Sequence, residues 1–562
     1  MLHHDKQIKL FLEQLISKGI KNVVISPGSR STPLVNNFLN NKDFFNIDLV
    51  LDERSAAYFA LGKAKKTNSP TILICTSGTA TLNYSPAISE AYYSKIPMIV
   101  ITSDRPMYFR ETGANQTLNQ TNLYQNNINW FYDIPLQTEL NIISNIAFKA
   151  INFSNNSPKG PVHINWQFNE PFTDGNIEKI NQTQSNEKII ISEINNEKLS
   201  YFIEISNNKR GIILVGDHNE NLDEISELSR NLNWPIIADP LSNLRDSKYY
   251  KNNTIIDTGD FLFRSSNPEI IPEVVIHIGS LPVSKFISKK IENAKNHIFI
   301  EDSNRLAEGF SKIDLHLKLR LSNLNTFLTK NKKNIIKVDD KWKKTLKNFN
   351  DILRYKIDEF IGNFKELSLK KTILENIPIN SNYISGNSLP VRHLDIIMNK
   401  SNKINFVGNR GLSGIDGNIS IATGYSNASE NHTFLDIGDL SFFHDVSSLI
   451  TAVRHGSKLT ILVNNNKGGQ IFNLLPQKKN MKKIYDEWFI TSHSDFSIEN
   501  ISKSFGCEYH YANNDSELKN IILENLSKNK VDIIELDISK SDYEDFNIEI
   551  NKIITDFENN ND

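Results

Sequence analysis

Two polar turns, each following an apolar run, contain residue types that can bind a metal ion. Asp439 lies in LDIGDLS, and Asn466 lies in LVNNNKGGQ. The residues between them are enough for one crossover helix, at about Ser447 to Val453, so two parallel strands would bring both turns to the same sheet edge. A carboxylate, an amide oxygen and the backbone carbonyl of Gly468 are hard ligands that suit Mg²⁺, which keeps phosphate oxygens for its other positions. The pattern predicts a site for a cation and a phosphate group, although two ordinary strand–helix turns would look the same locally.

Alternating helix and strand patterns must position these turns. Residues 6–18 place apolar side chains at helical spacing, and short apolar runs of buried-strand length follow. The strand candidates fall into three sets along the chain: NVVIS, TILICTS, MIVITSD and VHINW; GIILVGD, PIIADP, EVVIHIGS and HIFIED; INFVGN, TFLDIGD, LTILVNNN and VDIIELD. Such runs alternating with helices predict parallel sheets covered on both faces.

The fold class predicted from this pattern is α/β, with three doubly wound parallel-sheet domains. A polar stretch at 169–197 is typical of a linker, and a charged helical pattern runs from about 322 to 379. We therefore expect one domain at 1–180, a central domain at 190–340, a helical linker at 341–385 and a third domain at 386–562.

Composition excludes several classes of protein. The 562 residues include 63 basic and 65 acidic side chains, a net charge of −2, so there is no general basic field to hold a nucleic acid. Cys75 and Cys507 lie far apart without metal-ligand spacing, and each is expected to be a small buried hydrophobe. No apolar run has the length of a membrane span, and charges interrupt the N-terminus, which predicts a cytoplasmic protein.

The two polar turns resemble the thiamine diphosphate signature, in which GDG is followed about two dozen residues later by NN. Leu440 stands where the final glycine of GDG would be, and the GDLS form resembles the MenD family of thiamine-diphosphate-dependent synthases. Further motifs resemble the same family: PGSRSTPL at 27–34, TSGTA at 76–80, SDRP at 103–106, GANQ at 113–116, GNSLPVR at 386–392, NRGLSGIDG at 409–417 and NNNKGGQIFNLLP at 464–476. The likeness spans the first and third units, and VSK at 283–285 is the clearest match in the middle unit.

The resemblance implies thiamine diphosphate as cofactor, held with Mg²⁺ or Mn²⁺. The implied metal ligands are Asp439, Asn466 and Gly468, although alignment on the first asparagines would make Asn465 the ligand. Ile415 matches the apolar residue that props the cofactor into a bent form, but an ordinary core isoleucine would look the same. The implied cofactor contacts are Pro27, Glu53, Gly78, Asn83, Ile415, Gly438, Leu440, Ser441, Gln470 and Ile471.

Glu53, in VLDERSAAYFALG, is the candidate catalytic residue. The chemistry needs a carboxyl group hydrogen-bonded to the cofactor's aminopyrimidine, so that the cofactor's own nitrogen can remove the thiazolium C2 proton. In the family the activating glutamate lies in such a setting, on the first α/β domain. Taken by itself, Glu53 is more simply explained as an acidic residue at the start of a helix, where the helix dipole favours a negative charge.

The resemblance also implies the reaction. It is a decarboxylating carboligation of the transketolase-like transferase class: 2-oxoglutarate loses CO₂, and the remaining succinyl-semialdehyde unit adds to isochorismate in a Stetter-like 1,4-addition. The product is the cyclohexene carboxylate of menaquinone biosynthesis. Arginine suits substrates with several carboxylates because it forms planar, bidentate hydrogen bonds.

By position, Ser388, Arg392 and Arg410 would hold the oxoglutarate-derived end. Relatives often carry a second basic residue after Lys285, and here that position is Phe286. The residues expected to face isochorismate are Ser29, Arg30, Arg105, Asn115, Gln116 and Lys285, and Phe472 is a further expected substrate contact.

In this family the first domain of one subunit faces the third domain of another. Glu53 and Asp439 would therefore meet only across an interface, and the resemblance implies a homodimer or homotetramer, with no nucleic acid and no membrane as partner.

Three alternative functions compete with this interpretation. Another thiamine-diphosphate 2-oxoacid decarboxylase or carboligase would need fewer cations, and the arginine set and PGSRSTPL disfavour it. An inactive binding or regulatory protein on this fold would be signalled by loss of Glu53, Asp439 or Asn466, and all three are present. A nicotinamide dehydrogenase would need GxGxxG after its first strand, which SPGSRS does not fit.

Overall fold

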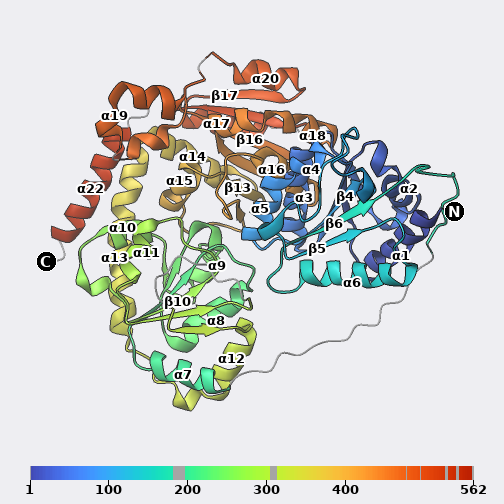
Figure 1. Cartoon of the computed structure of the whole chain (residues 1–562). Helices are drawn as coiled ribbons and strands as arrows, with labels where there is room; N and C mark the ends of the chain where they lie inside the picture. Colours follow the sequence, from blue (N-terminus) through green and yellow to red (C-terminus); the bar gives the residue numbers. More distant parts are fainter. Residues whose placement is uncertain are drawn as a thin grey trace.

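The protein is built from three α/β units, seen as the blue, green and orange regions of Figure 1. The computed structural model describes residues 2–180, 196–303, 313–475, 477–493, 495–525, 530–538 and 543–559. Most of the linker predicted at 169–197, and Pro476 of the last motif, lie outside these residues.

The first unit contains a six-stranded parallel sheet in the order β2-β1-β3-β4-β6-β5. Successive side chains of β1 point to opposite faces: Val23 packs in the apolar cluster of α1 and α6, and Val24 packs in the cluster of α3 and α5. The strands are β1 (Asn22–Ser26), β2 (Asn46–Leu49), β3 (Thr71–Cys75), β4 (Met98–Asp104), β5 (Trp130–Ile134) and β6 (Pro161–Gln167). The helices are α1 (His3–Ser17), α2 (Thr32–Asn40), α3 (Glu53–Thr67), α4 (Thr79–Leu82), α5 (Ser85–Tyr93) and α6 (Leu140–Asn155).

The middle unit has a six-stranded parallel sheet in the order β12-β11-β10-β7-β8-β9. Numbered from its own first strand, this is the order of doubly wound dinucleotide-binding sheets. The strands are β7 (Gly211–Val215), β8 (Ile236–Ala238), β9 (Ile255–Ile256), β10 (Val274–Ile278), β11 (Asn296–Ile300) and β12 (Leu315–Leu317). The helices are α7 (Asn196–Ser206), α8 (Leu222–Leu232), α9 (Ser247–Tyr250), α10 (Gly259–Arg264), α11 (Lys285–Ile291), α12 (Leu321–Lys330) and α13 (Asp340–Asn363).

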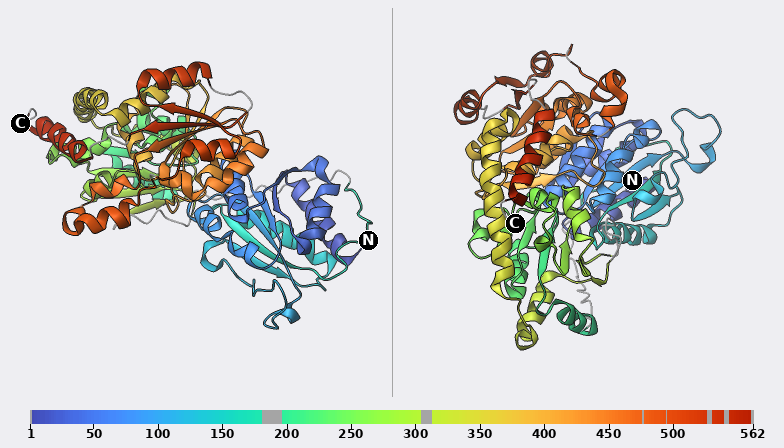
Figure 2. Two further views of the ribbon diagram at one scale, coloured as in Figure 1. Left: turned by 90° about the horizontal axis from the view of Figure 1, so that it is seen from above. Right: turned by 90° about the vertical axis from the view of Figure 1, so that its left-hand side faces the viewer.

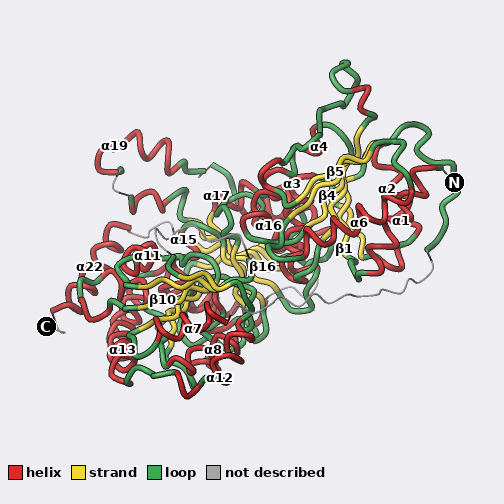
Figure 3. The backbone as a smooth tube through the Cα atoms, turned by 60° about the horizontal axis from the view of Figure 1, so that its bottom comes forward, coloured by secondary structure: helices red, strands yellow, loops and turns green. Residues whose placement is uncertain are grey.

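The third unit repeats the strand order of the first, as β14-β13-β15-β16-β18-β17, again all parallel. The strands are β13 (Asn382–Ser385), β14 (Asn405–Gly408), β15 (Thr433–Gly438), β16 (Leu459–Asn465), β17 (Glu508–Ala512) and β18 (Asp532–Asp537). The helices are α14 (Lys365–Asn376), α15 (Leu389–Ile397), α16 (Asn418–Asn427), α17 (Asp439–His444), α18 (Leu449–Arg454), α19 (Lys478–Tyr485), α20 (Ile498–Ser504) and α21 (Asp515–Asn520). After β18 the chain continues into α22 (Tyr543–Asn559). Figure 3 shows helices on both faces of the yellow strands.

The predicted fold class is confirmed, and each of the twelve apolar runs contains a strand. The strands that the sequence did not indicate are β2, β5, β9, β12, β13 and β17. All but β13 lie at the edge of a sheet, where one side is unpaired and the residues need not be continuously apolar.

Helices α13 and α22 belong to the apolar core of the middle unit. Trp342 and Leu353 of α13, and Phe546 and Phe557 of α22, are buried in the same cluster as the strands β7 and β10. Figure 2 shows α22 running beside α13. The segment expected as a helical linker is therefore part of a core, and β13 begins inside its predicted range.

The first and third units touch through two helices, α3 and α16, that cross at very close range. A Cβ on Gly62 would lie 2.1 Å from the carbonyl oxygen of Ile421, and one on Gly424 would lie 2.0 Å from that of Phe59. Only glycine allows the two backbones to approach so closely. Among the described residues, no helix has both the length and the apolar character needed to cross a bilayer.

Candidate active site

The two polar turns meet at the carboxyl edge of the third sheet. Asp439 is the first residue of α17, directly after β15, and Asn466 follows the neighbouring strand β16. The backbone N–H of Gly468 donates to Oδ2 of Asp439 at 2.7 Å, so the turns are in direct contact. The connection is made by α17, the short helix at Val446–Ser448 and α18, not by the single helix expected at about 447–453.

The carboxyl group of Asp439 is almost completely buried, at 3 % exposure. Burial raises its pKa to about 6, and backbone hydrogen bonds from Gly468 and Leu440 oppose this shift. Gly468 has φ +118°, and a Cβ there would lie 2.3 Å from the carbonyl oxygen of Ile490. This turn therefore depends on glycine, and it brings backbone polar groups against a buried carboxyl group.

The three consecutive asparagines have different environments because successive side chains of a strand alternate in direction. Asn464 and Asn466 line the same cavity. The amide of Asn465 instead donates to Oε1 of Glu535 at 2.6 Å, and its Oδ1 accepts from the backbone of Lys467.

A cavity of about 380 Å³ extends from these turns along the carboxyl edge of the sheet. All of its lining residues fall within 366–472. Those predicted from the sequence are Ser388, Arg392, Arg410, Ile415, Gly438, Asp439, Leu440, Ser441, Asn466, Gly468, Gln470, Ile471 and Phe472. Those that sequence reasoning missed are Glu366, Asn387, Leu389, Pro390, Ser413, Asn464 and Gly469. Most of these seven lie inside or beside the motifs, but nothing in the charged segment around Glu366 marked it.

The cavity wall also carries positive charge. Arg392 and Arg410 both line it, and the pKa of Arg392 is lowered, first by its removal from water and then by repulsion from Arg410. Nη1 of Arg392 donates to the carbonyl oxygen of Ser388 at 2.5 Å. Ser388 has φ +74°, a conformation that costs a non-glycine residue about 1–3 kcal/mol and is typical of functional sites. Two like charges held together in this way form a site suited to an anion with more than one carboxylate.

A buried polar network supports the cavity from below. Lys370 of α14 contacts both carboxylate oxygens of Asp436, at 2.8 and 2.6 Å. Asp436 also accepts from the hydroxyl of Tyr383 and from the amide of Asn464. Because Asn464 gives its amide nitrogen to Asp436 and to the carbonyl of Ile437, its orientation at the cavity wall is determined by residues beneath it. Loss of one member of such a buried ion pair typically costs about 3–5 kcal/mol.

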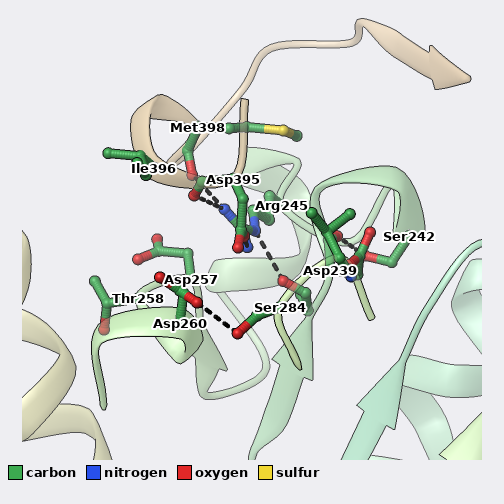
Figure 4. Close-up of polar contacts among 12 residues, drawn as sticks. Asp239, Ser242, Arg245, Asp257, Thr258, Asp260, Ser284, Asp395, Ile396 and Met398 are labelled. Atoms are coloured by element: carbon green, nitrogen blue, oxygen red, sulfur yellow. Dashed lines mark hydrogen bonds and ion pairs between the residues drawn. The ribbon is translucent and has the colours of Figure 1, made fainter. Parts of the chain in front are cut away.

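The middle unit holds the helix that carries Arg392. The buried Arg245 donates to the carbonyl oxygens of Asp395 and Met398, at 2.8 and 2.9 Å, and pairs with the carboxylate of Asp395 (Figure 4). Arg354 donates to the carbonyl oxygen of Ile396. These two arginines satisfy carbonyl groups at the C-terminal end of α15 that have no partner within the helix, and so orient its N-terminal end toward the cavity.

The residues predicted in the first unit gather at the carboxyl edge of the first sheet. Nη1 of Arg105 donates to the hydroxyl of Ser77 and to the carbonyl oxygen of Gln116, and Nε2 of Gln116 donates to the carbonyl oxygen of Ser77. Burial and the neighbouring Arg105 lower the pKa of Arg30. Most of the set is exposed: Pro27, Ser29, Asn83, Asn115 and Gln116.

Glu53 is the first residue of α3, whose N-terminus is capped by the side chain of Asp52. It is half-buried, and it does not line the cavity that contains Asp439. Within one chain the predicted residues thus form two separate groups. The cavity holds those of the third unit, and outside it lie Pro27, Ser29, Arg30, Glu53, Gly78, Asn83, Arg105, Asn115, Gln116 and Lys285.

Two family models match the units at either end of the chain. Residues 6–123 match the thiamine pyrophosphate enzyme N-terminal TPP binding domain, and residues 393–536 match the C-terminal TPP binding domain. These matches and the repeated parallel sheet define the class: a thiamine-diphosphate-dependent enzyme.

Curated relatives define the family within that class. Three are named 2-succinyl-5-enolpyruvyl-6-hydroxy-3-cyclohexene-1-carboxylate synthase. That of Oceanobacillus iheyensis is 33% identical (94% of this chain, 93% of the relative), that of Geobacillus thermodenitrificans 32% (95% and 94%), and that of Lysinibacillus sphaericus 35% (88% and 88%). The chain belongs to this synthase family, the MenD family.

Proposed function

We propose that the protein forms 2-succinyl-5-enolpyruvyl-6-hydroxy-3-cyclohexene-1-carboxylate in menaquinone biosynthesis, by decarboxylating 2-oxoglutarate and adding the remaining unit to isochorismate. The observation that carries the proposal is the cavity itself, whose lining combines Asp439, Asn466 and Gly468 with Arg392 and Arg410. The relatives that share nearly the whole chain carry the name of this synthase. Another thiamine-diphosphate decarboxylase or carboligase is not favoured.

Asp439, Asn466 and Gly468 are the proposed ligands of Mg²⁺ or Mn²⁺, and the residues fit such an ion. A buried carboxyl group would gain a counter-charge, and Asp439, Asn466 and Gly468, which carry hard oxygen donors, all line the same cavity. The contact of Asn465 with Glu535 supports Asn466 as the asparagine ligand. Gly438, Leu440, Ser441, Gln470 and Ile471, all lining the cavity, would contact the cofactor. Bound thiamine diphosphate would serve as the electron sink for the decarboxylation.

Ile415 is proposed to support the bound cofactor from one side. Its side chain lines the cavity and is 38% exposed, which a core isoleucine would not be. The hydroxyl of Ser441 donates to its carbonyl oxygen at 2.8 Å and holds this segment in place.

Glu53 is proposed to hold a proton at the aminopyrimidine ring nitrogen of the cofactor. Pro27, Gly78 and Asn83 would contact the same ring from the first unit. Because these residues lie outside the Asp439 cavity of their own chain, we propose that they complete the cavity of a second chain. Large apolar side chains beside both groups are exposed, with Leu51 at 77% and Leu412 at 51%, which supports a partner surface there.

The substrates are proposed to divide between the two groups. Ser388, Arg392 and Arg410 would bind the carboxylates of 2-oxoglutarate, with Phe472 beside them. The residues proposed for isochorismate are Ser29, Arg30, Arg105, Asn115, Gln116 and Lys285. A homodimer or homotetramer, the division into domains at 1–180, 190–340 and 386–562, and a cytoplasmic location remain predictions of the sequence.

The test is direct. Purified protein with thiamine diphosphate and Mg²⁺ should consume isochorismate only when 2-oxoglutarate is present, and should release one CO₂ for each isochorismate consumed. Release of CO₂ without any consumption of isochorismate would instead indicate a simple decarboxylase.

A further inference from the structure

An unassigned arginine lies beside Lys285. The guanidinium of Arg264, the last residue of α10, lies 4.0 Å from the centre of the Phe286 ring, and Nζ of Lys285 lies 5.4 Å from the same centre. One aromatic ring is thus shared by two cations. A guanidinium over an aromatic face is held in a defined place while its N–H groups remain able to donate.

Asp260 links these cations to each other. Its Oδ2 accepts from Nε of Arg264 at 2.9 Å, and its Oδ1 accepts from the hydroxyl of Ser284 (Figure 4). Ser284 caps the N-terminus of α11, which begins at Lys285. A single carboxylate therefore orients both Arg264 and the helix end that carries Lys285.

This group borders the helix that carries Arg392. Val283 packs against the apolar cluster that contains Val391 and Leu394 of α15. The carboxylate of Asp260 partly opposes the lowering of the Arg392 pKa that burial and Arg410 cause, as expected of a neighbouring opposite charge. Lys285 and Arg264 thus lie on the side of the middle unit that borders α15, the helix that carries Arg392.

We propose that Arg264 is a substrate-binding residue that donates to a carboxylate of the acceptor and supplies the cation that Phe286 does not. Its side chain is 24% exposed, and Nε is the nitrogen that donates to Asp260. The proposal rests on the proposed function, because it assigns Arg264 to the acceptor and not to 2-oxoglutarate. It explains how an aromatic residue after Lys285 is compatible with an acceptor bearing two carboxylates: the ring holds a cation from another helix.

The experiment compares Arg264→Gln with Arg210→Gln. Arg210 lies 5.5 Å from the Trp342 ring and immediately precedes β7, so it is also stacked on an aromatic ring but at the opposite edge of the same sheet. The readouts are the KM for isochorismate, the rate of CO₂ release from 2-oxoglutarate without acceptor, and the unfolding midpoint. Arg264→Gln should raise the KM about tenfold to a hundredfold and leave CO₂ release unchanged, since one charge-assisted hydrogen bond is lost. Arg210→Gln should change neither.

The double variant Arg264→Gln, Phe286→Arg should recover part of the lost affinity, because it returns a cation to the same place. An unchanged KM in a folded Arg264→Gln protein, or an equal loss of CO₂ release, would overturn the proposal. If wild-type protein shows no turnover, the proposed function fails. Isochorismate titrated calorimetrically into the cofactor-loaded proteins then decides on Arg264, with weaker binding to the variant supporting the proposal and equal binding refuting it.

Discussion

The first and third units have the same strand order but present different surfaces at the carboxyl edge of the sheet. In the third unit the polar residues line one cavity that contains the buried Asp439 and two arginines. In the first unit, Glu53 and the residues around Arg105 lie outside that cavity, and many of them are exposed. The same strand order therefore carries two different sets of polar residues, and the residues that follow each strand determine which set is present.

The two edges are also complementary in chemistry. In the proposed assignment the third unit would hold a cation and a diphosphate, while the first would supply an acid and cations. Each unit would then contribute one part of a thiamine diphosphate site. This difference is the basis for the shared-site proposal.

The largest effect is expected at the first unit. Glu53→Gln should lower turnover by about 10²–10⁴-fold, the usual contribution of a positioned acid–base group, while cofactor binding measured by intrinsic fluorescence is retained. Glu139→Gln, an exposed carboxylate in the same unit, is the control and should be fully active. Near-normal turnover of Glu53→Gln would contradict the proposed role of Glu53 in activating the cofactor.

Mixing two inactive variants should restore activity if the sites are shared. Glu53→Gln alters the first unit and Asp439→Ala alters the third unit. If each site combines the first unit of one chain with the third unit of the other, a mixed dimer contains one intact site. Random exchange should then give about a quarter of wild-type turnover. The variants are mixed after mild dissociation and assayed. No recovery in a mixture shown by mass spectrometry to contain mixed dimers would contradict the shared-site proposal.

At the metal site, Asp439→Ala and Asn466→Ala should each weaken Mg²⁺ and thiamine diphosphate binding together, by about tenfold or more, because the ion links protein to diphosphate. Asn465→Ala is the matched control, since its side chain contacts Glu535 outside the cavity. Fluorescence titration measures both affinities. If Asn465→Ala weakened Mg²⁺ binding more than Asn466→Ala did, Asn465 would be the metal ligand instead.

The substrates should separate by unit. Arg392→Gln should slow acceptor-free CO₂ release from 2-oxoglutarate, whereas Arg105→Gln should leave it intact and raise the KM for isochorismate. Each substitution should cost about 1.5–3 kcal/mol of substrate-binding free energy, the usual contribution of a hydrogen bond to a charged group. If Arg392→Gln impaired only acceptor use, the proposed division would be wrong even with the overall reaction confirmed.

A smaller effect is expected where the two units touch. Gly62→Ala places a methyl group against the carbonyl of Ile421 and should lower the free energy of unfolding by about 1–3 kcal/mol. Gly362→Ala is the control, because nothing lies within 4 Å of its added Cβ. Denaturant unfolding measures the free energy of unfolding of both variants. Equal values would mean that α3 and α16 can move apart at little energetic cost.

The sequence by itself determined the fold class and the meeting of two polar turns in the third unit. Apolar runs such as TILICTS and LTILVNNN must be buried on both faces, and this local property is enough to predict a parallel sheet. Asp439, Asn466 and Gly468 follow such runs directly, so parallel pairing alone brings their turns together. The sequence left the choice between Asn465 and Asn466 open, and the structure distinguishes them: Asn465 donates to Glu535, whereas Asn466 lines the cavity.

The tertiary structure decided what depends on contacts between distant segments. Glu366 sits in a charged helix with no motif, and becomes part of the cavity wall only because α14 packs over the third sheet. Arg245 and Arg264 are likewise unremarkable in sequence, yet one holds the end of α15 and the other is stacked on Phe286 beside Lys285. Edge strands and the placement of α22 on the middle unit were also invisible, because neither an unpaired strand edge nor the choice of a packing partner leaves a periodic pattern.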